Sequence, residues 1–466
     1  MMNLYPHQVD GVNMLRDSWY RGKRRPLLVF PVGSGKTVMF SYFSSEVAKK
    51  GKRTLILAHR NELLDQVSET LGKFDVRHTF IAADRYYDYR VNTHVGSVFT
   101  VAKRLDSLPE YDVIIVDEAH HSTLNTTWGK ILARYPKAFV IGVTATAWRL
   151  SGESLGDIYD DLIVGPSVAD LIARGFLSPY RLYAPGSIDD SKVRSVAGDY
   201  NKAQLERVSN RPSITGDAIK HYRKHADQKR AVAFCVTLAH AQSVCAKFNA
   251  AGVRSEIIDG TMEREARRSL VNRFKSGETT LMVSVDVVSE GFDLPAIECV
   301  ISLRKTKSLS LWIQQTGRGL RKLEGKKEAI ILDHAGNSLM HGLPDDPRTW
   351  SLVGEEPGRS RSDSSDAVRV CPSCFAAQRP GTDECIYCGA PFEIRARKIT
   401  ESDEELVEVD VSKARAKWSR MKEQQQAKTF DQLVALGKER HYPKPYGWAK
   451  RVWDARQAKR IRGKAV

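Results

Sequence analysis

The 466-residue chain has no run of about 18 apolar residues, the length that a membrane-spanning helix needs. Its first ten residues also lack the apolar core of a secretory signal. Cysteine is scarce, and three of the seven cysteines are scattered among apolar neighbours, where we expect ordinary core thiols: Cys235, Cys245 and Cys299. These absences exclude a membrane-spanning protein, and we expect a cytoplasmic chain with no membrane partner.

Acidic residues are outnumbered by basic ones, 56 against 72, which gives a formal net charge of +16. Such a balance favours a polyanionic partner, and nucleic acid fits it better than a membrane surface. The apolar content of 42% is typical of a globular protein. The length predicts two or three domains.

A glycine-rich turn lies between a short apolar run and a predicted helix at residues 38–50. It contains Gly33, Ser34, Gly35, Lys36 and Thr37. Glycines in such a turn let backbone N–H groups close on phosphate oxygens, while a lysine binds the β- and γ-phosphates and a hydroxyl binds Mg²⁺. A strict phosphate-loop pattern places glycine at position 30, where this chain has Phe30.

A second signal is a pair of carboxylates, Asp117 and Glu118, after the buried-strand pattern at 113–116. Adjacent carboxylates at a strand end are costly unless they serve a cation. We expect Asp117 to hold Mg²⁺ and Glu118 to orient and deprotonate the attacking water.

Polar residues also follow two other predicted strands. His59 and Arg60 follow residues 54–58, at the strand end that faces a ligand crevice. Thr144 and Thr146 follow residues 139–143, where hydroxyls would couple nucleotide state to a neighbouring domain or merely cap a turn. Near the start, Gln8 is placed to read an adenine edge, which would select ATP.

These residues, in this order and with His120 after the carboxylates, resemble the first motor domain of a superfamily 2 helicase of the DEAH/DExH kind. The resemblance implies a second parallel-sheet domain without a phosphate loop. Short apolar strands alternating with helical segments do follow, at 231–236, 281–285, 300–303 and 329–332. The predicted fold is therefore α/β, with two RecA-like domains in tandem.

The second half carries residues that resemble two further helicase motifs. Residues 285–293 resemble the fifth motif, which implies that Gly291 and Asp293 bind the nucleotide. Residues 314–321 resemble the sixth, with Gln314 toward the nucleic acid. Arg318 and Arg321 are three residues apart, so on a helix they would share a face and form the arginine fingers.

Closer details resemble the bacterial RadD family and its phage relatives, which also place a cysteine module after the motor. They are residues 57–64, 198–200 and 332–336. The chain departs from the family pattern at Thr144 to Trp148, which reads T-A-T-A-W instead of T-A-T-P. We expect RecA-like domains at 1–180 and 181–340, a linker at 341–368, a zinc module at 369–392 and a basic segment at 393–466.

The remaining four cysteines form two C-x-x-C pairs. They are Cys371, Cys374, Cys385 and Cys388. Such pairs indicate a four-thiolate Zn²⁺ site, and disulfides are the alternative, disfavoured in a reducing cytosol. A closed Cys₄ site has no open position, which predicts a structural role.

In the last 25 residues aromatic and basic side chains interleave. Lys450 and Arg451 are placed to neutralise phosphates, while Trp448 and Trp453 would either stack on bases or pack as a short helical tail.

Together these patterns predict an ATP-dependent DNA helicase or translocase that uses ATP, Mg²⁺ and structural Zn²⁺. We expect DNA, single-stranded or branched, as its partner, with single-strand-binding or recombination proteins as further candidates. The expected setting is repair, recombination or phage replication at the nucleoid of a bacterial or phage-infected cell. Alternatives are a duplex translocase that does not unwind, an RNA helicase and an ATP-gated recruitment module.

Overall fold

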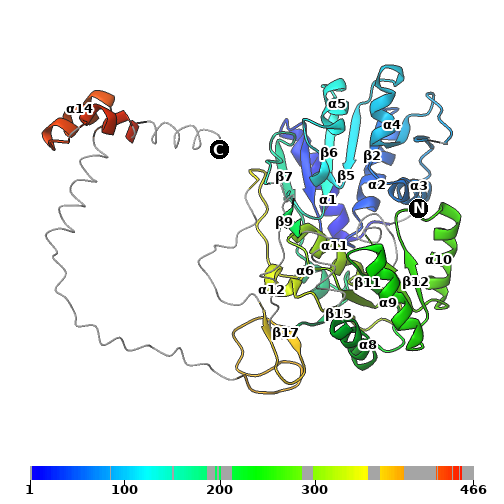
Figure 1. The fold of residues 1–466 in the computed structure, drawn as a ribbon. Coiled ribbons are helices and arrows are strands. Elements are labelled where there is room, and N and C mark those ends of the chain that lie inside the picture. Colours follow the sequence, from blue (N-terminus) through cyan, green and yellow to red (C-terminus); the bar gives the residue numbers. More distant parts are fainter. Residues whose placement is uncertain are drawn as a thin grey trace, which may run out of the picture. The chain divides into compact units, whose positions relative to one another are not determined.

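The computed structural model describes residues 3–83, 85–149, 152–185, 195–196, 199–200, 212–285, 297–354, 368–392, 427, 429–442, 444–450 and 452–453. The chain divides into a large unit, Met1–Glu393, and a small one, Ile394–Val466. The large unit contains two parallel sheets flanked by helices (Figure 1), which confirms the predicted fold class. None of the helices in the described part combines the length and apolar character needed to cross a bilayer.

The first lobe is built on seven strands in the order β3-β4-β2-β5-β6-β1-β7, and every neighbouring pair is parallel. In chain order they are β1 (Pro26–Val29), β2 (Thr54–Ala58), β3 (His78–Ile81), β4 (Thr93–Ser97), β5 (Val113–Asp117), β6 (Phe139–Thr144) and β7 (Asp161–Val164). The central strands are buried along their whole length, as expected when helices cover both faces.

Helices cover the two faces of this sheet in two groups. One group packs with Leu28 and Ile56, and the other packs with their neighbours Leu27 and Leu55, because successive strand residues point to opposite faces. The first group is α1 (Pro6–Tyr20), α2 (Lys36–Lys49) and α3 (Asn61–Lys73), and the second is α4 (Val98–Lys103) and α5 (Thr127–Arg134). Short 3₁₀ turns are η1 (Leu105–Ser107) and η2 (Ala119–His121).

The second lobe has eight strands in the order β12-β13-β11-β14-β15-β8-β17-β16. The first six are parallel: β8 (Tyr180–Tyr183), β11 (Ala231–Phe234), β12 (Ser255–Ile258), β13 (Leu281–Ser284), β14 (Cys299–Ser302) and β15 (Ala329–Asp333). The last two, β16 (Arg369–Val370) and β17 (Ala376–Gln378), are antiparallel and belong to the cysteine module. The cysteine module therefore extends the second sheet beyond β8.

Helices also cover both faces of the second sheet. α8 (Pro212–Ala226) and α9 (Leu238–Ala250) pack on one face, and α10 (Arg264–Ser276) and α11 (Leu309–Gly319) on the other. The latter core also includes Val32, Ala145 and Trp148 from the first lobe. Further elements are α6 (Val168–Ala173), α12 (Asn337–His341) and the antiparallel pair β9 (Ser195–Val196) and β10 (Asp199–Tyr200).

The beginning of the segment expected to be a linker, 341–368, is packed against both lobes. Trp350 contacts apolar cores of the first and the second lobe. The carbonyl of Leu352 accepts hydrogen bonds from Ser154 Oγ at 2.8 Å and from the backbone N–H of Gly156 at 2.9 Å. Residues 343–354 of the expected linker are therefore packed on the lobes, because two bulky apolar side chains, Trp350 and Leu352, interrupt the polar run.

The C-terminal unit contains α14 (Phe430–Glu439) and a second helical stretch at 445–450. Leu433 and Ala449 are buried between them, and Trp448 and Trp453 pack on this small core. The tryptophans thus follow the packing alternative, within their own unit. Lys450 is exposed, whereas Arg451 lies outside the described residues.

Candidate active site

The phosphate-loop sequence forms a tight turn between β1 and α2. Gly33 and Gly35 have φ angles of +82° and +83°, in the left-handed region that favours glycine. α2 begins at Lys36, immediately after this turn. Backbone N–H groups at the start of a helix lack partners within the helix, which makes this a ready site for an anion.

Phe30, the departure from the phosphate-loop pattern, is a core residue at the end of β1. Its ring lies where a Cβ on Gly11 or on Gly165 would fall, within 2.8 Å and 2.3 Å of the nearest ring atom. Two glycines on neighbouring segments therefore make room for an aromatic ring.

Residues before α1 and in its first turn brace the loop from behind. Gln8 Nε2 donates to the Ser34 carbonyl at 3.1 Å, and Gln8 Oε1 accepts from the Tyr5 N–H at 2.9 Å. His7 Nε2 lies 2.9 Å from the same Ser34 carbonyl. Gln8 is thus a buried support of the loop, and His7 is a second support that the sequence analysis missed.

Lys36, Asp117 and Glu118 come together at the carboxyl ends of β1 and β5. Lys36 Nζ donates to the carbonyls of Phe30 at 3.1 Å and Pro31 at 3.2 Å, and burial lowers its pKa. Burial, followed by the neighbouring Glu118, raises the pKa of Asp117 to about 7. Burial and the neighbouring carboxylate make the negative charge of this pair unfavourable, and a bound cation would offset that cost. The residues therefore fit Mg²⁺.

The backbone at Glu118 has φ +49°, unusual for a residue with a side chain. Glu118 Oε2 accepts no hydrogen bond within the described residues and lies 3.4 Å from His120 Nδ1. The carboxylate is thus held near a histidine at a strained turn, an arrangement frequent at functional sites.

A chain of hydroxyl groups leads from His120 to the second lobe. Thr144 Oγ1 donates to the Thr146 carbonyl at 3.0 Å, so at its 3.0 Å contact with His120 Nδ1 the histidine is the donor. Thr146 Oγ1 lies 2.8 Å from Ser310 Oγ on α11. The hydroxyls at the end of β6 therefore contact the neighbouring lobe directly, and Ser310 is a partner that the sequence analysis did not name.

Arg149 holds the backbone around the carboxylate pair. Its Nε donates to the His120 carbonyl at 3.2 Å, one Nη donates to the Ser122 carbonyl, and the other donates to the Ser154 carbonyl at 2.6 Å. The side chain is buried, which lowers its pKa. Arg149 directly follows the stretch Thr144 to Trp148, but no motif in the sequence distinguishes it.

Polar residues of α11 and of the turn after it approach the first lobe. Arg318 is 4% exposed, and both Arg318 and Arg321 act electrostatically on Lys36. Arg321 lies beyond the helix, in a bridge with Leu177, and its Cγ would be 3.2 Å from a Cβ on Gly33. The argument that both arginines share a helix face was wrong, because α11 ends at Gly319; they reach the same pocket by different routes.

Gln314 is buried on α11, and neither polar atom of its amide has a hydrogen-bond partner among the described residues. Gly291 and Asp293, expected at the nucleotide, lie outside the described residues.

Two of the residues expected to touch nucleic acid, His59 and Arg60, lie between β2 and α3 of the first lobe. The His59 ring packs against that of His121, with centroids 4.9 Å apart. Arg267 on α10 has a pKa lowered first by burial and then by Arg60 of the first lobe. Arg60 of the first lobe therefore acts electrostatically on Arg267 of the second, and Arg267 is a residue that the sequence analysis missed.

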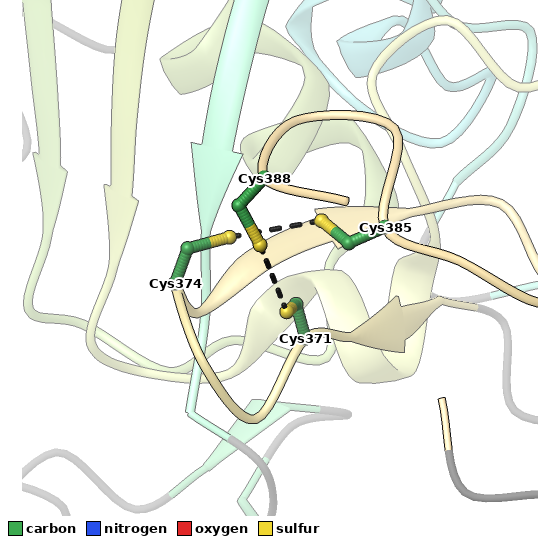
Figure 2. Close-up of side chains that lie close together, drawn as sticks. All are labelled: Cys371, Cys374, Cys385 and Cys388. Atoms are coloured by element: carbon green, nitrogen blue, oxygen red, sulfur yellow. Dashed lines mark hydrogen bonds between the residues drawn. The ribbon is translucent and has the colours of Figure 1, made fainter. Parts of the chain in front are cut away.

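The four predicted metal ligands form one cluster, shown in Figure 2. The sulfurs of Cys371 and Cys388 are 3.7 Å apart, as are those of Cys374 and Cys385, and none of these cysteines forms a disulfide. A tetrahedral Zn²⁺ with bonds of about 2.3 Å requires sulfurs about 3.8 Å apart. The cluster therefore fits zinc, and its geometry argues against the disulfide alternative.

The two C-x-x-C turns repeat one backbone pattern. In each, the residue after the second cysteine, Phe375 or Gly389, has a positive φ and donates its N–H to the carbonyl of the first cysteine. The N–H of the first cysteine donates to a carbonyl five residues later, at 2.9 Å in both turns. The backbone thus shapes two matching halves of a thiolate site.

Two family models match the chain. Residues 1–149 match the model described as the type III restriction enzyme res subunit, and residues 214–322 match the helicase conserved C-terminal domain. A 51.5 kDa protein of a Lactococcus phage is 34% identical over 385 residues, 81% of each chain. IRC3 of Saccharomyces cerevisiae, described as an ATP-dependent helicase, is 30% identical over 72% of this chain, but the match spans only 52% of that protein.

Among solved structures, a fragment of an HsdR subunit of a type I restriction enzyme from Vibrio vulnificus has a similar fold. Its TM-score is 0.59 at 21% identity, covering 74% of this chain and 67% of that one. The two matched family models, one of them a helicase domain, together with the helicase relative and the two-lobed fold, show that this protein belongs to the ATP-hydrolysing helicases of superfamily 2.

Proposed function

We propose that the protein is a motor that moves along DNA by hydrolysing ATP between its two lobes. The observation that carries this proposal is the meeting of Lys36, on the first lobe, with Arg318 and Arg321 of the second. Cations from both sides of one pocket suit a triphosphate whose charge grows during transfer of its γ-phosphoryl group. Binding and release of ATP would then close and open the lobes.

Each residue of the first lobe has a proposed task. The backbone of Gly33, Ser34 and Gly35 would bind phosphate oxygens, and Lys36 would bind the β- and γ-phosphates. Thr37 and Asp117 would hold Mg²⁺, which neutralises phosphate charge when bound. Glu118 would be the general base. One N–H of Gln8 Nε2 donates to the loop, and the other N–H of the same amide would donate to the adenine.

The proposed DNA track crosses the opening between the lobes. Arg60 of the first lobe acts electrostatically on Arg267 of the second, and a phosphate placed between the two guanidinium groups would bind both. Nucleotide state would be transmitted to this track by His59, His120, Thr144 and Thr146. Gln314 would contact the track from α11. In the C-terminal unit, exposed Lys450 and the residues after it would add further phosphate contacts.

The cysteine cluster is proposed to hold one structural Zn²⁺ on Cys371, Cys374, Cys385 and Cys388. Five features remain predictions. They are the closeness to the RadD family, a role in repair, recombination or phage replication, the single-stranded or branched substrate, the partner proteins and the cytoplasmic compartment.

ATP turnover on matched substrates tests the motor. We expect single-stranded or forked DNA to stimulate turnover at least tenfold over the basal rate, and RNA of the same sequence to stimulate it less. Plain duplex as the best activator would favour a duplex translocase, and RNA as the best activator an RNA helicase.

The variant Glu118→Gln sharpens this test. It should bind ATP and DNA but turn over about 10³-fold more slowly, because the water loses its base. Glu69→Gln, on an exposed side of α3, is the control. Normal turnover in Glu118→Gln would remove the proposed base, and no stimulation by any nucleic acid would contradict the motor.

A further inference from the structure

A groove of about 960 Å³ lies on the first lobe, at the end of the sheet opposite to the active site. Its walls come from the last turns of α1, α2 and α5 and from the turns that lead into β5 and β6. Lys36 and Asp117 lie at the carboxyl ends of the strands, whereas the groove reaches Val113 at the amino end of β5. The groove is therefore separate from the ATP site.

Aromatic side chains line part of the groove. Trp19 is 45% exposed, and its ring is fixed against Phe139 with centroids 4.4 Å apart. Tyr20, the last residue of α1, is 84% exposed. Leaving these two rings exposed forfeits the apolar stabilisation that their burial would give the free protein. The exposed faces of Trp19 and Tyr20 are therefore available to a flat partner.

Six basic residues also line the groove, and two of them are already paired. Lys52 pairs with Asp112 at 3.0 Å, and Arg134 pairs with Glu110. The third carboxylate of the groove, Glu46, pairs with Lys49 on its own helix. The other four basic residues are Arg16, Arg24, Lys50 and Lys137. Their side chains form no ion pair among the described residues, although the backbone N–H of Arg24 donates to Asp160 Oδ2 at 2.9 Å.

Helix ends explain only part of this charge. Lys50 caps α2, where a cation is favourable near the C-terminal carbonyls. Arg24 and Lys137 lie outside helices, in turns that come together because Arg24 donates to the Lys137 carbonyl. Cations brought together from separate connections, beside exposed rings, form the chemistry that binds phosphates and stacks bases.

We propose that this groove is a second binding site for single-stranded nucleic acid, outside the track between the lobes. Phosphates would contact Arg24, Lys50 and Lys137, and a base would stack on Tyr20 or Trp19. An acidic peptide would also neutralise the cations. The Tyr20 ring, however, is too exposed to enclose an apolar side chain of such a peptide. The site rests on the nucleic-acid binding of the family and not on the motor proposal.

Charge reversal tests the site with a fluorescent oligothymidine of 20 nucleotides as the probe. We expect the full-length triple variant Arg24→Glu, Lys50→Glu and Lys137→Glu to bind this probe at least tenfold more weakly than the unaltered protein does. The steepness of the plot of log affinity against log salt concentration should fall by about 2, since each phosphate contact on a single strand contributes about 0.7 to it. Basal ATP turnover without nucleic acid should not change, which shows that the variant folds.

The matched control reverses three exposed lysines of the same lobe outside the groove, Lys73, Lys103 and Lys130, with the same change in net charge. It should lower the slope by much less. Tyr20→Ala should weaken binding about tenfold with the slope unchanged, because stacking does not release counterions. Irradiation of an iodouracil-containing probe should crosslink it to Tyr20 or Trp19.

Equal losses in the groove variant and its control would overturn the site, as would an unchanged slope in the groove variant. Unchanged probe binding together with lost binding of a glutamate-rich peptide would assign the groove to a protein partner instead. These readouts measure binding alone, so a failure of the motor proposal leaves them interpretable.

Discussion

The two lobes hold their polar residues in different ways. In the first lobe, Lys36, His120 and Thr144 are hydrogen-bonded to other groups of the same lobe. In the second lobe, the amide of Gln314 is buried on α11 without a hydrogen-bond partner among the described residues. A buried polar group without a partner costs about 1–3 kcal/mol, so α11 is arranged for a partner from outside its own lobe.

This difference suggests a division of labour. The loop, Lys36, His120 and Thr144 of the first lobe are held within that lobe, which makes this part of the site preorganised, although Glu118 Oε2 accepts no hydrogen bond among the described residues. The second lobe contributes groups whose value depends on how the lobes meet. Four predictions follow this contrast, beginning with the group that depends on it most.

Arg318→Ala should separate the two contributions. We expect turnover to fall by about 10³-fold, as for other arginine fingers, while the dissociation constant of ATP changes by less than a few fold. Rapid-quench turnover and nucleotide binding measure the two effects. Arg254→Ala is the control, because this exposed arginine lies at the amino end of β12. A comparable loss of affinity and turnover would mean that the second lobe helps to build the ground-state site.

The edges of the two sheets sharpen the contrast. The first sheet ends at β7, whereas the second continues from β8 into β17 of the cysteine module. Removing the proposed Zn²⁺ with a chelator should speed amide hydrogen exchange in β17 and β8 by about a hundredfold, because structural thiolate sites fold with their metal. Exchange in β7 should not change. Metal analysis of the untreated protein is the control, and slow exchange after complete removal would show that the module folds without metal.

The first lobe was more predictable than the second, for a physical reason. The phosphate loop, the carboxylate pair and the hydroxyls lie at the ends of buried apolar strands, and both strand and turn are local patterns. The structure starts α2 at Lys36 rather than at residue 38, a small error at a helix end. Phe30 was not understood, since its explanation requires Gly11 and Gly165 from distant segments.

The misjudged features depend on tertiary contacts. Three-residue spacing suggested a shared helix face for Arg318 and Arg321, but spacing does not show where a helix ends. The packing of residues 343–354 on both lobes depends on Trp350 and Leu352, two apolar side chains within a polar stretch. His7, Arg149 and Arg267 have no motif of their own, and only their contacts distinguish them.

Arg149→Ala tests whether the first lobe is preorganised. The substitution leaves the carbonyls of His120 and Ser122 without their charged donor, so the free energy of unfolding should fall by about 3 kcal/mol. The loosened carboxylates should lower kcat by about 20-fold with KM nearly unchanged. Arg149→Lys should restore little, because an ammonium group cannot reach several carbonyls in a fork. Full activity in a folded Arg149→Ala variant would show that the strained turn at Glu118 keeps its shape unaided.

The smallest effect is expected at a hydroxyl contact that joins the two lobes, Thr146 to Ser310. Thr146→Val and Ser310→Ala should each reduce the stimulation of turnover by DNA about threefold and leave basal turnover unchanged. The double variant should be no worse than either single one, with a coupling energy of about 0.6 kcal/mol, because both substitutions remove the same hydrogen bond. Ser308→Ala, which removes the N-cap of α11 but not this contact, controls for damage to the helix. If the two effects multiply instead, the hydroxyls act separately, and the lobes communicate through the apolar contacts of Ala145 and Trp148.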